Sequence, residues 1–136
     1  MKVAVNPSRI NRLDLFEKAG IEVVEGRVAS EDDMIELMQD VDGAQVGVMP
    51  LTSRYVLENC PKLKVVSRFG VGVDSIDLEA ATELGILACN VPGSNTTEVA
   101  DHAMALLLNM TRRLYDSIKT TKEGAWADEP RLTGTY

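Results

Sequence analysis

Short apolar segments alternate with helix-forming segments along this chain, and that alternation limits the possible folds more than any other feature. The apolar segments are rich in valine and isoleucine and are bounded by turn residues, which is typical of strands. Strands that are apolar at nearly every position are buried on both faces, so the pattern predicts a parallel sheet covered by helices. The predicted strands are residues 2–6, 21–26, 44–49, 63–68 and 86–90.

Helix signals fill the intervals between these segments. Asn6-Pro7 offers a cap and a first-turn proline for a helix that runs to about Ala19. Ser30 and Asp33 have the spacing of a capping box. Repeated strand–helix units of this kind predict an α/β fold with a flavodoxin-like, doubly wound parallel five-stranded sheet in the order 2-1-3-4-5. The other predicted helices are residues 30–40, 53–59 and 78–84, the last capped by Asp77.

The pattern changes after residue 95. Asn95 and Glu98 have the spacing of another capping box, and the helix they begin is expected to reach about Ser117. This helix is apolar on nearly all sides up to Met110, so it should be buried against a second domain or subunit. The polar tail beyond it indicates an extended arm anchored by Trp126. The expected division is residues 1–95, 96–118 and 119–136.

Charge and cysteine content restrict the partners and the compartment. The formal net charge of −7, without a long run of like charge, argues against nucleic-acid or anionic-membrane binding. The longest apolar run, residues 103–108, is far too short to span a bilayer, and no signal peptide is visible. Cys60 and Cys89 form no metal or redox motif and are expected to be reduced, which favours the cytoplasm.

A glycine-rich turn follows the fourth predicted strand. Gly70-Val71-Gly72 lacks the third glycine of a dinucleotide fingerprint, and the next strand ends in Cys89-Asn90 rather than in an acid. The better hypothesis is that the two glycines turn backbone amides inward beside Arg68, where they would hold a carboxylate. The competing interpretation is a plain tight turn with a surface arginine.

Other polar residues give weaker signals. Asp74 and Asp77 could form a metal or acid–base pair, but capping of the turn and of the next helix is favoured. His102 has no nucleophile or second histidine nearby and is interpreted as structural. Thr96 and Thr97 are cap residues that could also face a cofactor. The sequence therefore predicts no metal site and no catalytic residue.

The segment RFGVGVDSIDLEAATELGILACNVPGSNTTEVADHAMALLLNMTRRL resembles the D-isomer-specific 2-hydroxyacid dehydrogenase family. The resemblance is strong from Leu63 to Trp126 and rests on G-x-G-x-D, I-D, A-x-x-x-G-I, N-x-P-G and V-A-acid-H-A in the correct order. The sequence of this segment is also similar to the C-terminal-binding-protein branch and to enzymes called phosphoglycerate dehydrogenase. The resemblance implies reversible hydride transfer between NAD(H) and a small 2-keto or 2-hydroxy acid in the parent enzyme.

The resemblance also implies roles for individual residues. Backbone amides would bind the substrate carboxylate beside an arginine, a neighbouring turn would line the substrate pocket, and the head of the long helix would approach the nicotinamide. The implied substrate-binding residues are Arg68, Val71, Gly72, Met49, Pro50 and Leu51, and the implied cofactor-binding residues are Asn95 and Val99.

The chain departs from the family pattern at its end. Family members continue into a Rossmann domain with a true G-x-G-x-x-G and the catalytic Arg, Glu and His, whereas this sequence stops at Tyr136. We therefore expect a truncated substrate-binding domain that is inactive alone, holds no NAD tightly, and forms a homodimer through residues 96–118, with exchange of the helix or the arm as one route. The alternatives are a stand-alone receiver or flavodoxin-type module and a pure interaction domain that uses the long helix.

Overall fold

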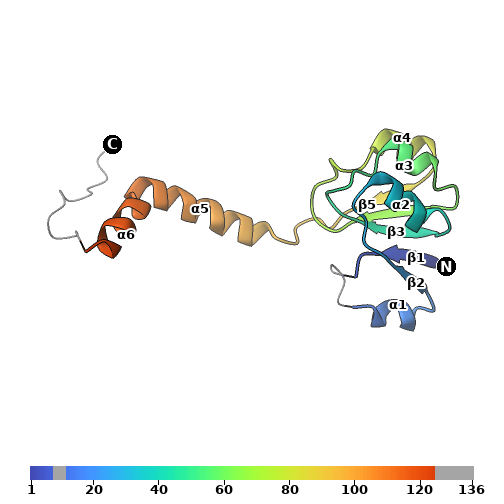
Figure 1. The fold of residues 1–136 in the computed structure, drawn as a ribbon, viewed down its shortest axis with the longest axis horizontal. Coiled ribbons are helices and arrows are strands. Elements are labelled where there is room, and N and C mark those ends of the chain that lie inside the picture. The colour runs from blue at the N-terminus through green and yellow to red at the C-terminus, as the bar shows by residue number, and fades with distance from the viewer. Residues whose placement is uncertain (8–11, 125–136) are drawn as a thin grey trace. The chain divides into compact units, whose positions relative to one another are not determined.

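The computed structural model describes residues 1–7 and 12–124, and the chain divides into two compact units, Met1–Ser94 and Asn95–Tyr136. The first unit contains a five-stranded sheet whose strands are all parallel and lie in the order β2-β1-β3-β4-β5 (Figure 1). The predicted fold class and strand order are confirmed. The strands are β1 Lys2–Val5, β2 Glu22–Glu25, β3 Gly43–Val46, β4 Val65–Arg68 and β5 Leu87–Cys89.

One face of this sheet carries the hydrophobic core. The register places Ala4, Ala44, Val66 and Ala88 side by side across four strands, so their side chains share a face. Small side chains in this row let the helices approach the sheet closely. The helices on this face are α2 (Glu31–Met38), α3 (Arg54–Glu58) and α4 (Leu78–Glu83), and they contribute Met34, Met38, Val56, Leu57, Ala80 and Ala81 to the same cluster (Figure 1).

The opposite face is covered less completely. α1 (Asp14–Lys18) lies on this side, where it contacts β2 (Figure 1). Phe16 of α1 lines an apolar hollow there with Val3 and Val65. Leu87, in register with Val65 on this face, is 63% exposed. Within the described part of the first unit, helical cover of this face is therefore limited to its β1–β2 side.

Local sequence signals explain where most helices begin. The Ser30 hydroxyl accepts from the Asp33 amide at 3.1 Å while the Asp33 carboxylate accepts from the Ser30 amide at 3.0 Å, so the predicted capping box forms. Asp77 accepts from the Ala80 amide at 2.8 Å and caps α4, as predicted. The first helix differs from its prediction, because α1 begins at Asp14 rather than after Pro7. Residues 8–11 of that predicted helix lie outside the described residues.

The second unit contains two helices where one was predicted for residues 96–118. α5 runs from Thr96 to Arg112, and Arg113 then adopts a left-handed conformation with φ 49° and ψ 43°. This residue breaks the helix, and α6 follows over Leu114–Lys122, so the start of the predicted arm is helical. Trp126 and the rest of the arm lie outside the described residues.

The predicted capping box at the head of α5 does not form. Asn95 has φ −140° and ψ 26° and makes no side-chain hydrogen bond to the helix, so its amide group does not cap the first turn. Among the helices described, none is long and apolar enough to cross a membrane.

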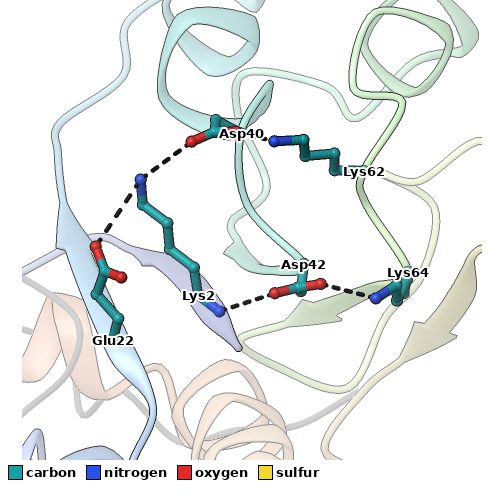
Figure 2. A network of polar contacts seen from close by, with 6 residues as sticks. All are labelled: Lys2, Glu22, Asp40, Asp42, Lys62 and Lys64. Atoms are coloured by element: carbon teal, nitrogen blue, oxygen red, sulfur yellow. Dashed lines mark hydrogen bonds and ion pairs between the residues drawn. The ribbon is translucent and has the colours of Figure 1, made fainter.

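Charged residues gather at the amino ends of the strands. Lys2 donates its backbone amide to Asp42 at 2.9 Å, and its ammonium group lies 3.4 Å from Asp40. Lys64 donates to Asp42 at 2.8 Å, which joins the strand starts of β1, β3 and β4. The members of this amino-end network are Lys2, Glu22, Asp40, Asp42, Lys62 and Lys64, as Figure 2 shows.

Both cysteines are free thiols. Cys60 belongs to the hydrophobic core, and its burial raises the pKa of the thiol to about 11. Cys89 is half-buried at the end of β5. A buried thiol with a raised pKa is a poor nucleophile, so Cys60 acts as a small apolar side chain.

Candidate functional site

The candidate site begins with Arg68, the last residue of β4, and the turn that follows it. We call residues 68–72 the glycine turn. Gly70 has φ 147°, a backbone conformation that side chains other than glycine rarely adopt. A Cβ atom at Gly70 would lie 2.8 Å from Arg68 Cζ and would overlap its Nη1, while a Cβ at Gly72 would lie 3.9 Å from that nitrogen. The guanidinium group therefore lies against the backbone of its own turn, and the two glycines leave room for it.

Neighbouring segments hold the glycine turn in place. The Phe69 amide donates to the Val46 carbonyl at 3.0 Å, and the Val91 amide donates to the Gly70 carbonyl at 2.9 Å. Asn90 Nδ2 donates to the Val71 carbonyl at 2.6 Å. The carbonyl groups of the turn thus face internal donors, while within the described chain the amides of Val71 and Gly72 have no hydrogen-bond acceptor. Amides left free beside a guanidinium can bind an anion.

The second predicted element, the turn from Met49 to Leu51, belongs to the segment after β3, which is hydrogen-bonded to residues that follow the glycine turn. The Thr52 amide donates to the Ser75 carbonyl at 2.8 Å, and the Asp77 amide donates to the Thr52 carbonyl at 3.0 Å. Ser75 Oγ donates to the Gly47 carbonyl at 3.0 Å. These bonds fasten the segment after β3 to the segment after β4.

The side chains of the Met49 turn differ in exposure. Met49 is 71% exposed and Leu51 is 45% exposed, whereas Pro50 is buried and follows a cis peptide bond. The predicted substrate-pocket residues therefore present two apolar side chains outward. They lie on the segment that is hydrogen-bonded to the one after the glycine turn.

Buried polar atoms without a partner gather at this same end of the sheet. Among the described residues four such atoms occur, and all belong to β3, to the segment after it, or to the end of β4. Buried polar atoms are normally hydrogen-bonded, so such a cluster marks a place where a ligand or water is expected. The atoms are Gln45 Nε2, Thr52 Oγ1, Ser53 Oγ and Arg68 Nε.

Positive charge at the site comes from a single side chain. Arg68 is the only Lys, Arg or His within residues 43–53 and 65–77. Arg54, the arginine nearest to Arg68 in sequence, donates to Glu83 at 2.6 Å, and this ion pair lowers the pKa of the Glu83 carboxyl. Asp74 lies beside Gly72, where it would repel a second negative group on a ligand.

The described residues do not fit a dinucleotide at this turn. The helix after the turn starts at Asp77, whose carboxylate already accepts the Ala80 amide and would repel a pyrophosphate there. The third glycine position is Ser75, which is buried and bonded to Gly47. In the described ranges, no cluster of three His, Cys, Asp or Glu residues is placed to hold a metal ion.

The predicted site residues thus fall in two places. Arg68, Val71 and Gly72 share the glycine turn, and Met49–Leu51 lie on the adjoining segment. Asn95 and Val99 lie at the head of α5 in the second unit, where Val99 is 58% exposed. His102 is exposed on the same helix.

Sequence reasoning missed four polar residues that shape this site, namely Gln45, Ser53, Ser75 and Asn90. Gln45 had a visible signal, since it is the one polar side chain inside the apolar third strand. Ser53, Ser75 and Asn90 stand in or beside turns, where polar residues are common and carry little information.

The fold defines an α/β domain whose glycine turn lies at the carboxyl end of its parallel sheet, which is where such sheets bind ligands. The family model for the catalytic domain of D-isomer-specific 2-hydroxyacid dehydrogenases matches residues 3–130. The chain belongs to this family, as the resemblance implied. This assignment replaces the receiver and flavodoxin alternatives.

Individual relatives agree with the assignment. The chain is 35% identical over 127 residues to the D-3-phosphoglycerate dehydrogenase of Archaeoglobus fulgidus, covering 93% of this chain and 24% of that protein. It is 39% identical over 93 residues to the glyoxylate reductase of Thermococcus litoralis, covering 68% of this chain and 28% of that protein. A solved structure of NAD-dependent formate dehydrogenase from Staphylococcus aureus in complex with NAD superimposes with a TM-score of 0.76 at 29% identity, covering 93% of this chain and 43% of that one.

The chain spans about a quarter of the length of the curated relatives it matches first.

Proposed function

We propose that this chain is the substrate-binding part of an NAD-dependent D-2-hydroxyacid dehydrogenase and that the glycine turn binds the carboxylate of a small 2-keto or 2-hydroxy acid. The observation that carries the proposal is the Arg68 guanidinium lying against Gly70 beside the free amides of Val71 and Gly72. An arginine offers paired donors to a carboxylate, and backbone amides add directional hydrogen bonds. The buried, unpartnered Arg68 Nε supports the same interpretation.

The contribution of the chain to the reaction is binding and orientation. The carboxylate is fixed at the glycine turn, and the apolar side chains of Met49 and Leu51 shield the rest of the acid from water. NAD supplies the hydride acceptor or donor when it is bound to the whole enzyme. Asn95 and Val99 would lie near the nicotinamide, and this chain alone would hold no NAD tightly.

Calorimetric titration of the 136-residue chain with pyruvate tests the carboxylate site. Pyruvamide is the matched neutral ligand, because it keeps the shape and loses the charge. We expect saturable pyruvate binding and no measurable binding of pyruvamide. Equal heats for the two ligands would refute a site built on Arg68.

The chain by itself should not transfer hydride, because the residues around the glycine turn include no histidine or lysine able to exchange a proton with the keto group at neutral pH. A spectrophotometric assay with NADH and pyruvate should show no oxidation of NADH above the background rate. Steady turnover by this chain alone would overturn this part of the proposal.

The partner proposed for the second unit is a second copy of the chain. α5 exposes many large apolar side chains, and an exposed apolar surface of this kind favours association. A homodimer through residues 96–118, with exchange of the helix or the arm as one route, would cover them. The exposed residues include Val99, Met104, Leu106, Leu107, Leu108 and Met110.

Sedimentation velocity tests this partner. Leu107→Glu should convert the dimer to a monomer, whereas Leu15→Glu, an equally exposed leucine on α1, should not. A monomeric wild-type chain at high concentration would refute the homodimer and favour the alternative of an interaction module whose helix binds another protein. The two free cysteines agree with the proposed cytoplasmic location.

A further inference from the structure

A cavity of about 190 Å³ lies behind the Met49–Pro50 turn. Its walls come from the ends of β1, β2 and β3 and from α2, entirely within the first unit. β1 and β3 are neighbours at the point where the strand order reverses, and ligands of doubly wound sheets bind in the crevice at that point. The cavity therefore lies at the switch point of the sheet, between the hydrophobic core and the Met49–Pro50 turn.

The cavity is lined mostly by apolar residues, with polar groups also exposed to it, and it is uncharged. Twelve residues line it and none is Asp, Glu, Lys, Arg or His; Asn6 and Gln45 carry its longer polar side chains. An apolar cavity of about 150 Å³ is large enough to hold a benzene ring. The space behind the turn thus suits a branched aliphatic or phenyl group. The apolar lining residues are Val28, Met34, Leu37, Met38, Met49 and Pro50.

The cavity adjoins the carboxylate site through Gly47. This residue lines the cavity, and its carbonyl accepts a hydrogen bond of 3.0 Å from Ser75 Oγ on the segment after the glycine turn. Val46, also in the lining, accepts from the Phe69 amide at 3.0 Å. One backbone hydrogen bond therefore joins the wall of the cavity to the glycine turn, and one side-chain hydrogen bond joins it to the segment after that turn.

Charge at the site selects against a second anionic group. Arg68 is the only basic residue within residues 43–53 and 65–77, and Asp74 lies beside Gly72. A phosphate ester adds about −1.5 to −2 charges at neutral pH, for which these segments hold no further cation. The first relatives matched are D-3-phosphoglycerate dehydrogenases by name, so their substrate would be a poor match for this site.

We propose that the cavity receives the apolar side chain of a 2-keto acid whose carboxylate is held at the glycine turn, so that the substrate class is a branched-chain or aromatic 2-keto acid and not a phosphorylated one. This inference rests on the proposed function, since it takes the glycine turn as the carboxylate site. Methionine side chains are flexible and polarizable, so Met34, Met38 and Met49 can adjust to the inserted group.

Nuclear magnetic resonance titration of the 136-residue chain tests the proposal with three probes. These are 4-methyl-2-oxopentanoate, pyruvate and 3-phosphoglycerate, followed through the amides of Val71 and Gly72 and the methyl groups of Met34 and Met38. The branched acid should bind about tenfold or more tightly than pyruvate, because added methylenes are buried in an apolar pocket. It alone should shift the two methionine methyl groups, and 3-phosphoglycerate should bind no more tightly than pyruvate.

Val28→Phe fills the cavity from a partly buried position in the segment before α2. It should remove the advantage of the branched acid over pyruvate. Leu15→Phe on the exposed surface of α1 is the matched control and should preserve the advantage. A dispersed amide spectrum reports that the Val28→Phe chain is folded, and the wild-type methyl shifts provide a readout independent of any variant.

The outcomes test the substrate class and the carboxylate site separately. Equal affinity for pyruvate and the branched acid, or tighter binding of 3-phosphoglycerate, with intact shifts at Val71 and Gly72, would overturn the substrate class and leave the carboxylate site standing. Shifts at neither amide with any of the three acids would overturn the carboxylate site itself, and the substrate class with it.

Discussion

The two ends of the central sheet treat their polar groups in opposite ways. At the amino ends of the strands, the amino-end network pairs lysine and aspartate groups with one another (Figure 2). At the carboxyl ends, Arg68 Nε and Gln45 Nε2 are buried without a partner, and the amides of Val71 and Gly72 have no acceptor within the described chain. The same strands run between the two ends, so the difference arises from the side chains and turns at each end.

The amino end of the sheet therefore contributes mainly to stability, and the carboxyl end contributes mainly to ligand binding. Paired groups at one end tie β1 to the segments before β3 and β4, which favours the folded state without any ligand. Unpaired groups at the other end do not stabilise the folded state through internal hydrogen bonds, and they remain available to a bound anion. Substitutions at the carboxyl end should therefore change binding more than stability, and those at the amino end should do the reverse.

The largest effect is expected for Arg68→Gln. Removing the guanidinium should weaken pyruvate binding by about tenfold to a hundredfold, the worth of hydrogen bonds to a charged group. The free energy of unfolding should change by less than about 1 kcal/mol, because Arg68 Nε has no partner to lose. Arg54→Gln is the control: it breaks the contact with Glu83 and should leave pyruvate affinity unchanged. Calorimetry and urea unfolding measure both quantities.

Gly70→Ala should lower both pyruvate binding and the stability of the fold. The positive φ of 147° penalises a side chain by about 1–2 kcal/mol, and the new Cβ would push the Arg68 guanidinium away from the turn. Pyruvate binding should be lost together with that much stability. Gly20→Ala also places a side chain at positive φ, here 66°, but in open space, so it should cost stability of the same order and keep full binding. Retained binding in Gly70→Ala would contradict the account.

A smaller effect is expected for Asn90→Ala. This change removes the hydrogen bond of 2.6 Å to the Val71 carbonyl that orients the glycine turn, so pyruvate affinity should fall about fivefold. Asn59→Ala removes the same type of bond, from Asn59 Nδ2 to the Tyr55 carbonyl at 2.8 Å, at the end of α3. If both variants bind pyruvate equally well, the turn does not depend on Asn90.

The smallest effect concerns the amino-end network and appears as pH dependence. Hydrogen bonds from Lys62 and Lys2 lower the pKa of the Asp40 carboxyl in the folded state. The associated stability is present above the unfolded pKa of about 3.9 and is lost as the pH falls below it. Asp40→Asn should reduce the difference in urea midpoint between pH 7 and pH 3 without changing pyruvate affinity at pH 7. An unaltered pH difference would show that the network contributes nothing.

Much of the fold followed from sequence because its signals are local. The strands are apolar runs bounded by turn residues, and the Ser30 and Asp77 caps depend on groups three residues apart. The break at Arg113 could not be predicted, because an arginine in left-handed conformation carries no glycine or proline signal. Asn95 had the right spacing for a cap, but its backbone angles do not allow one.

The site was predictable in part for the same reason. Arg68, Val71 and Gly72 are neighbours in sequence, and motif and turn chemistry place them together. The contacts of Ser75 with Gly47 and of Asn90 with Val71 span 28 and 19 residues and depend on how adjacent strands end. The unpartnered state of Gln45 Nε2 depends on packing across several strands, which the order of residues does not reveal.

The carboxyl end of the sheet is proposed to be an anion site, and the amino end is not. Titrating the 136-residue chain with acetate while following every backbone amide by nuclear magnetic resonance tests this directly. We expect saturable shifts centred on Val71 and Gly72, absent in Arg68→Gln, with no saturable shift at Lys62 or Lys64. Shifts centred on those lysines, or unchanged shifts in Arg68→Gln, would contradict it.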